Sequence, residues 1–120
     1  MELLFESTKS FEKELSKFSG STKNKIVEKL NCYCSLLESE DKSLFYKNAY
    51  QPIRFKGRSD SSLYALKIDR DIRIILTVDE DPIFEQIIIT LLHVVRHSSL
   101  DKVFKGIAES LYQQRLNGDD

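Results

Sequence analysis

The chain has 120 residues, 41% hydrophobic and 31% charged, a balance that fits one compact domain and does not indicate a disordered protein. Its formal net charge of −1 excludes the strong overall attraction to nucleic acid that a basic domain has. We expect one domain over residues 1–116 and a loose acidic tail at 117–120. Because no signal peptide or long apolar run is present, a cytoplasmic location without a membrane partner is expected.

The chain is predicted to open with a strand and a helix. The apolar run at residues 3–5 indicates the strand, and Ser7 and Thr8 follow it as cap-forming residues. Apolar side chains then recur at helical spacing: Phe11, Leu15 and Phe18. Gly20 is expected to end this helix.

A second helix should begin near Ser21 or Thr22, either of which can cap it. Its apolar stripe contains six residues: Ile26, Val27, Leu30, Tyr33, Cys34 and Leu37. The lysines between them are interleaved with glutamate, which is typical of a solvated face. Cys32 and Cys34 diverge at i, i+2 on a helix, so we expect free thiols and predict no metal and no cofactor.

Strands dominate after an irregular stretch at 38–62. We predict them at 63–68, 72–78 and 87–95. The last of these is apolar on both faces, which is typical of a central strand. His93 lies inside it and is interpreted as a hydrogen-bonded core histidine.

A last helix is predicted after Ser98, which begins an S-x-x-[DE] capping pattern ending at Asp101. Its apolar residues follow helical spacing: Leu100, Val103, Phe104, Ile107, Ala108 and Leu111. The expected fold class is therefore α+β in the order β-α-α-β-β-β-α. A small, mostly antiparallel sheet would carry an N-terminal helical hairpin and a C-terminal helix.

Charge is segregated along the chain. Seven cations and three anions lie between Lys47 and Arg73, and acidic residues follow at 79–85. The apolar pattern of the hairpin at 63–78 fixes its register, because side chains alternate between faces. A three-residue loop at 69–71 places Ile68 opposite Ile72, and Lys67 then stands opposite Arg73.

Two cations directly across a ladder repel each other, and an anion would relieve this. A nearby carboxylate such as Asp69 or Asp71 is one candidate, and a phosphate backbone is the other. Arg96 and His97 lie at the exit of the last strand, before a helix N-terminus that favours anions. If these residues approach the Lys67–Arg73 face, His97 could act as a general acid or base.

The segment RFKGRSDSSLYALKIDRDIRIILTVDEDP at 54–82 resembles the RelE/ParE superfamily of bacterial toxins. The resemblance is carried by Phe55-Lys56-Gly57, Leu63-Tyr64, Lys67 and Arg73-Ile74-Ile75. It implies the toxin of a type II toxin–antitoxin system, held inactive by a cognate antitoxin protein. In the RelE branch the implied activity is metal-independent cleavage of mRNA on the ribosome, which inhibits translation.

The resemblance also assigns residues to roles. The implied catalytic residues are Lys67, Arg73, Arg96 and His97, and the implied RNA-binding residues are Lys56, Arg58 and Arg70. Phe104 stands where several ribonuclease members have tyrosine, and it fits the apolar stripe of its helix. Two alternatives remain open: a ParE-like protein that inhibits DNA gyrase by binding, and an attenuated member that only binds its antitoxin.

Overall fold

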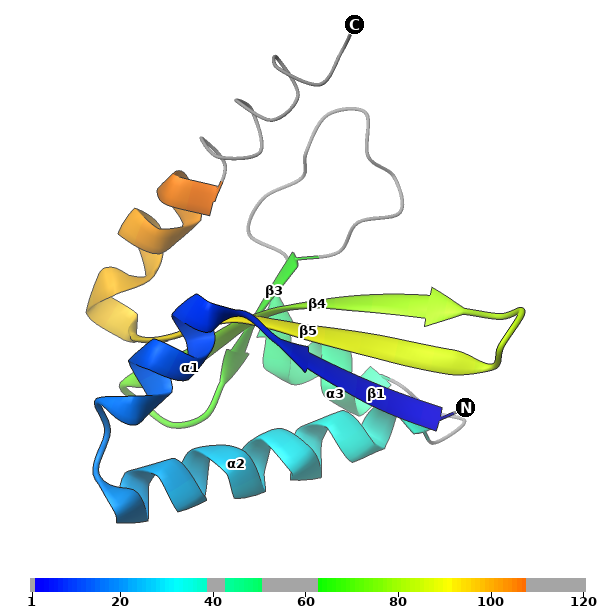
Figure 1. Ribbon diagram of the computed structural model, residues 1–120, viewed down its shortest axis with the longest axis horizontal. Coiled ribbons are helices and arrows are strands. Elements are labelled where there is room, and N and C mark those ends of the chain that lie inside the picture. The colour runs from blue at the N-terminus through cyan, green and yellow to red at the C-terminus, as the bar shows by residue number, and fades with distance from the viewer. Residues whose placement is uncertain (1, 39–42, 51–62, 108–120) are drawn as a thin grey trace, which may run out of the picture.

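The computed structural model describes residues 2–38, 43–50 and 63–107 (Figure 1). In chain order the elements are β1 (Glu2–Ser7), α1 (Lys9–Ser16), α2 (Gly20–Ser35), η1 (Leu36–Glu38), α3 (Ser43–Asn48), β2 (Ala49–Tyr50), β3 (Leu63–Lys67), β4 (Ile72–Asp81), β5 (Gln86–Arg96) and η2 (His97–Ser99). A helix over 100–107 follows η2 directly and is called the C-terminal helix below. The predicted acidic tail at 117–120 lies outside the described residues.

The strands form one mixed sheet in the order β1-β5-β4-β3-β2. β1 runs parallel to β5, and the other neighbouring pairs are antiparallel. The α+β class and the three long strands are as predicted. β5 is central, as its two apolar faces indicated, because β1 and β4 flank it.

Helices cover both faces of this sheet (Figure 1). α1, α2 and α3 contribute Phe11, Ile26, Leu30, Cys34 and Phe45 to the larger core, where they meet apolar residues of β4 and β5. The C-terminal helix packs Leu100 and Phe104 against Ala65, Ile75 and Val95 on the other face. Phe104 is thus a core residue, as its place in the apolar stripe predicted.

Two elements were not predicted from the sequence. α3 and β2 lie within the stretch at 38–62 that was expected to be irregular. α3 has only six residues, too few to display a helical period. Its position is set by Phe45, whose side chain is fully buried, so the tertiary core defines this helix.

The helix boundaries differ from the predicted ones at Gly20. α1 ends at Ser16, and Gly20 is the first residue of α2 rather than a stop signal. The N-cap of α2 is Ser19, whose Oγ accepts the Thr22 N–H at 3.4 Å, so the prediction of Ser21 or Thr22 was wrong. Thr8 caps α1 as expected and accepts the Phe11 N–H at 3.1 Å.

The start of the last helix also differs. A 3₁₀ turn at His97–Ser99 precedes it, and Arg96 is the N-cap of that turn. The Arg96 side chain makes no capping bond. The His97 N–H instead donates to the Asp71 carbonyl at 2.5 Å, which extends the β4–β5 pairing by one residue. The sheet therefore satisfies the N–H at the start of the 3₁₀ turn.

Cys32 is exposed, Cys34 is buried, and both are free thiols. Burial raises the pKa of the Cys34 thiol to about 12, so this thiol stays protonated at neutral pH. No helix in the described part of the chain is long and apolar enough to cross a membrane.

Candidate anion-binding site

The β3–β4 hairpin has the predicted register. Leu66 pairs with Ile74, and Lys67 pairs with Arg73. The Ile68 N–H donates to the Ile72 carbonyl at 3.0 Å, which closes the three-residue loop. Two cations therefore stand directly opposite each other, as the apolar pattern indicated.

The Lys67–Arg73 pair lies on the face that the C-terminal helix covers. Lys67 lies two residues after Ala65 in β3, and Arg73 lies two residues before Ile75 in β4, so each cation shares a face with that apolar residue. Ala65 and Ile75 both belong to the smaller core. Arg73 also pairs across the sheet with Val95. Lys67 and Arg73 therefore lie on the same face as the smaller core, at the end of the sheet where the β3–β4 turn lies.

The two side chains differ in exposure. Lys67 is exposed, whereas Arg73 is only 9% exposed. Arg73 Nη1 donates to the carbonyl oxygens of Asp69 at 2.5 Å and of Ile72 at 3.1 Å. These acceptors hold the guanidinium in place but carry no formal charge, so they do not neutralise it.

The carboxylate of Asp69 is engaged elsewhere. It accepts the backbone N–H groups of Asp71 and Ile72 at 2.8 Å each, and the Lys25 ammonium from α2 at 2.9 Å. The Lys25 hydrogen bond, followed by the backbone donors, lowers the pKa of Asp69 to about 2. Asp69 is therefore ionised at neutral pH, and its charge is matched by Lys25.

Asp71 is engaged as well. Its Oδ2 accepts a hydrogen bond from Arg96 Nη1 in an exposed ion pair. The Arg96 guanidinium also lies over the Phe18 ring, 5.4 Å from the centroid, and Phe18 packs against the larger core. Arg96 pairs with Ile72, which belongs to that same core, so register places it on the face opposite Lys67 and Arg73.

His97 is joined to this end of the sheet through its backbone bond to Asp71. It follows β5 directly and is the first residue of the 3₁₀ turn, at the end of the sheet where Lys67 and Arg73 lie. Its side chain is exposed. Of the four predicted catalytic residues, Lys67 and Arg73 thus share a face at one end of the sheet, Arg96 lies on the other face, and His97 lies in the turn at the same end.

The predicted RNA-binding residues divide into two groups. Arg70 is exposed at the tip of the β3–β4 turn, next to the cation pair in sequence. Lys56 and Arg58 lie outside the described residues. The described cations at this end of the sheet that have a carboxylate partner are Lys25 and Arg96, and neither salt bridge includes Lys67 or Arg73.

The contacts that α2 makes with this turn were not predicted from the sequence. Lys25 and Lys29 were interpreted as part of a solvated face. Lys25 instead binds Asp69, and the Lys29 ammonium donates to the Ile68 carbonyl at 2.8 Å. Their i, i+4 spacing puts both lysines on one side of α2. This spacing was the feature of the sequence that could have indicated a shared contact.

His93 was predicted to be a hydrogen-bonded core histidine, and it is hydrogen-bonded but half-buried. Its Nδ1 lies 3.0 Å from Glu14 Oε1 of α1, and the same oxygen accepts the Val94 N–H at 3.3 Å. Thr8 Oγ1 also donates to the Leu92 carbonyl at 2.8 Å. α1 therefore satisfies the edge of β5 beyond the end of β1, and His93 belongs to that structural contact.

The described residues contain no group of three or more His, Cys, Asp or Glu side chains arranged to hold a metal ion. Comparisons of the chain with models of known families, with curated proteins and with solved structures found no match.

Proposed function

We propose that this protein is an mRNA endonuclease toxin of the RelE type that binds an RNA phosphate at Lys67 and Arg73. The observation that carries the proposal is the engagement of both turn carboxylates. Asp69 is paired with Lys25, and Asp71 is paired with Arg96. Neither carboxylate therefore neutralises the positive charges of Lys67 and Arg73, which stand opposite each other beside the turn. A phosphate group would supply the missing negative charge.

The anchoring of Arg73 supports this role. Its Nη1 is fixed by two carbonyl oxygens, so the guanidinium keeps one orientation and loses little conformational entropy when it binds an anion. Lys67 is exposed and can adjust to the bound phosphate. Arg73 therefore supplies a positive charge at a fixed position, and Lys67 supplies one that can move toward the phosphate.

The chemistry that suits this arrangement is cleavage by the RNA itself. The ribose 2′-hydroxyl gives up its proton to a base and its oxygen attacks the adjacent phosphorus. The bond to the 5′-oxygen breaks, the departing oxygen takes a proton, and a 2′,3′-cyclic phosphate remains. Lys67 and Arg73 would stabilise the negative charge that develops on the phosphate oxygens. His97, which follows β5 at the same end of the sheet, is the residue proposed to transfer these protons. Arg96, paired with Asp71, is assigned a smaller role.

The first test is mapping of transcript 5′ ends in cells after brief induction of the wild-type chain, Lys67→Gln or Arg73→Ala, each without an antitoxin. We expect new ends within translated messages for the wild type and their loss in both variants. Lys13→Gln is the matched control, because it removes the same charge from an exposed position on α1.

Since Arg73 is nearly buried, Arg73→Ala can fail by misfolding, and thermal unfolding of each purified variant separates this case. Lys67 is exposed, so Lys67→Gln tests the site without that complication. A folded Lys67→Gln protein that cleaves messages as the wild type does would refute the proposed site.

A ParE-like gyrase inhibitor is the second candidate. It is favoured by Phe104, which is buried in the smaller core and brings no hydroxyl to the site. Growth arrest with intact messages, together with inhibition of DNA supercoiling by the purified protein, would select this function. Normal growth with intact messages would select an attenuated member that only binds its antitoxin.

A further inference from the structure

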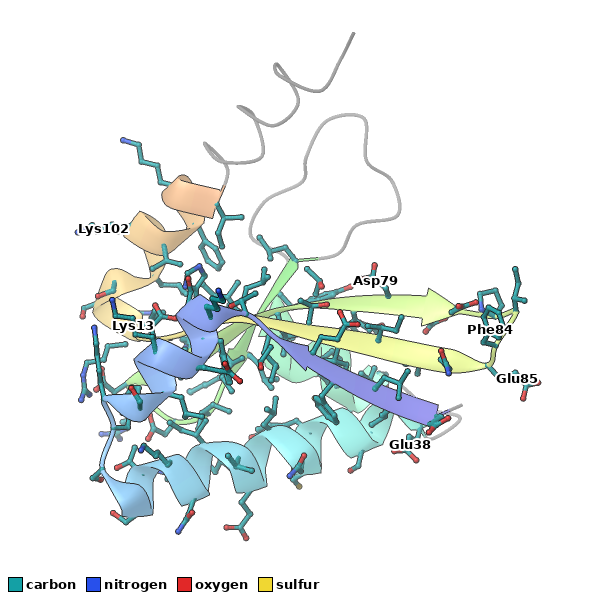
Figure 2. All side chains as sticks on the ribbon, in the orientation of Figure 1. Lys13, Glu38, Asp79, Phe84, Glu85 and Lys102 are labelled. Atoms are coloured by element: carbon teal, nitrogen blue, oxygen red, sulfur yellow. The ribbon has the colours of Figure 1, made fainter. Side chains whose placement is uncertain are left out.

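The turn between β4 and β5 presents two large apolar side chains to solvent. Ile83 is 84% exposed and Phe84 is 71% exposed, the highest values among the large hydrophobic residues of the described chain. Figure 2 shows Phe84 at the outer end of the two long strands. Tight turns ordinarily use Gly, Asn, Asp or Ser, so the turn itself does not require these two side chains.

The backbone of this tip is held on both sides. Asp81 Oδ1 accepts the N–H groups of Ile83 at 3.1 Å and of Phe84 at 3.4 Å. Glu85 adopts a left-handed conformation with φ 52°, and its carbonyl accepts the Glu2 N–H at 3.0 Å. The two apolar side chains are therefore presented by an ordered turn, which lowers the entropic cost of inserting them into a partner.

The surroundings of the tip are acidic. Asp79, Glu80, Asp81 and Glu85 lie in or next to the turn, and the chain has no lysine or arginine from 74 to 95. Figure 2 shows Glu38, Asp79 and Glu85 toward one end of the long axis and Lys13 and Lys102 toward the other. This sign of charge repels a phosphate backbone and an anionic membrane, and it attracts a basic protein surface.

We propose that the tip, residues 81–85, is a docking element that inserts Ile83 and Phe84 into an apolar pocket bordered by Lys or Arg on a different protein. Apolar anchors inside a charged rim are the usual form of an interface hot spot. The docking element is separate from the Lys67–Arg73 site, because Arg73 is the second residue of β4 and Asp81 is its last. At about 3.3 Å per residue, Arg73 and the start of the tip lie roughly 26 Å apart. The inference does not depend on the proposed RNA cleavage.

The test places the photoreactive amino acid p-benzoylphenylalanine at position 84 of the full chain in cells. The matched control has it at position 27, where Val27 is 44% exposed on α2. We expect a crosslink to one other protein from position 84 and not from 27. Mapping of the crosslinked peptide should place it at apolar residues with Lys or Arg beside them, and Glu85→Lys should lower the yield severalfold.

Four outcomes would overturn the proposal: no crosslinked product, equal products from both positions, crosslinks to nucleic acid or lipid, or crosslinks to a second copy of this chain. The affinity of the purified crosslinked protein then gives a second measurement. An Ile83→Ser, Phe84→Ser double variant should bind it at least about thirtyfold more weakly. The same variant should unfold at the wild-type midpoint, and unchanged affinity would count against the docking element.

Discussion

The two turns that flank β4 have the same local structure and opposite surroundings. In each, an aspartate accepts the backbone N–H groups two and three residues later: Asp69 in the β3–β4 turn and Asp81 in the β4–β5 turn. The first turn is tied to α2 through Lys25 and Lys29, and its flanking Ile68 and Ile72 are buried. The second exposes Ile83 and Phe84.

This difference teaches that the tertiary setting, and not the turn motif, decides what turn residues do. Where α2 reaches the turn, the carboxylate has a distant cation as a partner and the nearby isoleucines join the core. At the other turn the carboxylate bonds only its own backbone in the contacts described, and the apolar side chains remain available to a partner. The five predictions below start from this contrast and run from the larger expected effects to the smaller ones.

The largest difference is expected between two isoleucine truncations. Ile72→Ala removes a side chain that is buried beside the first turn, so it should lower the free energy of unfolding by about 2–4 kcal/mol. Ile83→Ala, at the second turn, should change it by less than about 0.5 kcal/mol. Urea unfolding of both variants measures this difference, and equal losses would remove the contrast between the turns.

The two aspartates give the next effect. Asp69→Ala loses two backbone hydrogen bonds and the Lys25 contact, so we expect a loss of about 1–2 kcal/mol. Asp81→Ala loses only turn bonds and should cost about 0.5–1 kcal/mol. Double-mutant cycles with Lys25→Ala isolate the helix contact, since coupling is expected with Asp69 and not with Asp81.

The low pKa of Asp69 adds a pH dependence with a defined sign. The pKa of Asp69 in the folded state is about 2, below its ordinary value of 3.8. Ionised Asp69 therefore stabilises the folded state at pH values above about 4. This contribution is lost as the pH falls from about 4 toward 2. Urea midpoints of the wild type and Asp69→Asn should therefore converge over that range, and a constant gap would contradict the assigned cause.

Lys67→Glu should separate stability from function. The new carboxylate faces Arg73 and replaces repulsion with attraction, so we expect a gain of about 0.5 kcal/mol in unfolding free energy. The same change should abolish message cleavage, because it supplies internally the negative charge that the phosphate would bring. Lys67→Gln is the neutral control, and a more stable Lys67→Glu protein that still cleaves RNA would contradict the proposed site.

A similarly small effect is expected at Arg96. Its ion pair with Asp71 is exposed on both sides, so Arg96→Gln should cost less than about 1 kcal/mol. Because Arg96 lies on the other face of the sheet, the variant should retain most of the message cleavage that Lys67→Gln loses. Thermal unfolding together with 5′-end mapping compares the two. A complete loss of cleavage in a folded Arg96→Gln protein would contradict this assignment and indicate that Arg96 takes part in catalysis.

The sequence by itself determined the parts of this protein that depend on local periodicity. Alternation of apolar residues fixed the register of the β3–β4 hairpin and hence the Lys67–Arg73 pair, because a shift of one residue would turn the apolar side chains to the wrong face. Continuous apolar character identified β5 as central. Helical spacing located most of the buried stripe of α2 and the core position of Phe104.

Only the tertiary structure decided the partners of the turn carboxylates. Lys25 meets Asp69 across 44 positions of sequence and Arg96 meets Asp71 across 25, and no local pattern encodes such distant pairs. The same holds for the exposure of Ile83 and Phe84, whose apolar residue types are also those of a buried strand. Periodicity reports which residues share a face, whereas burial and charge pairing depend on which elements the folded chain brings against that face.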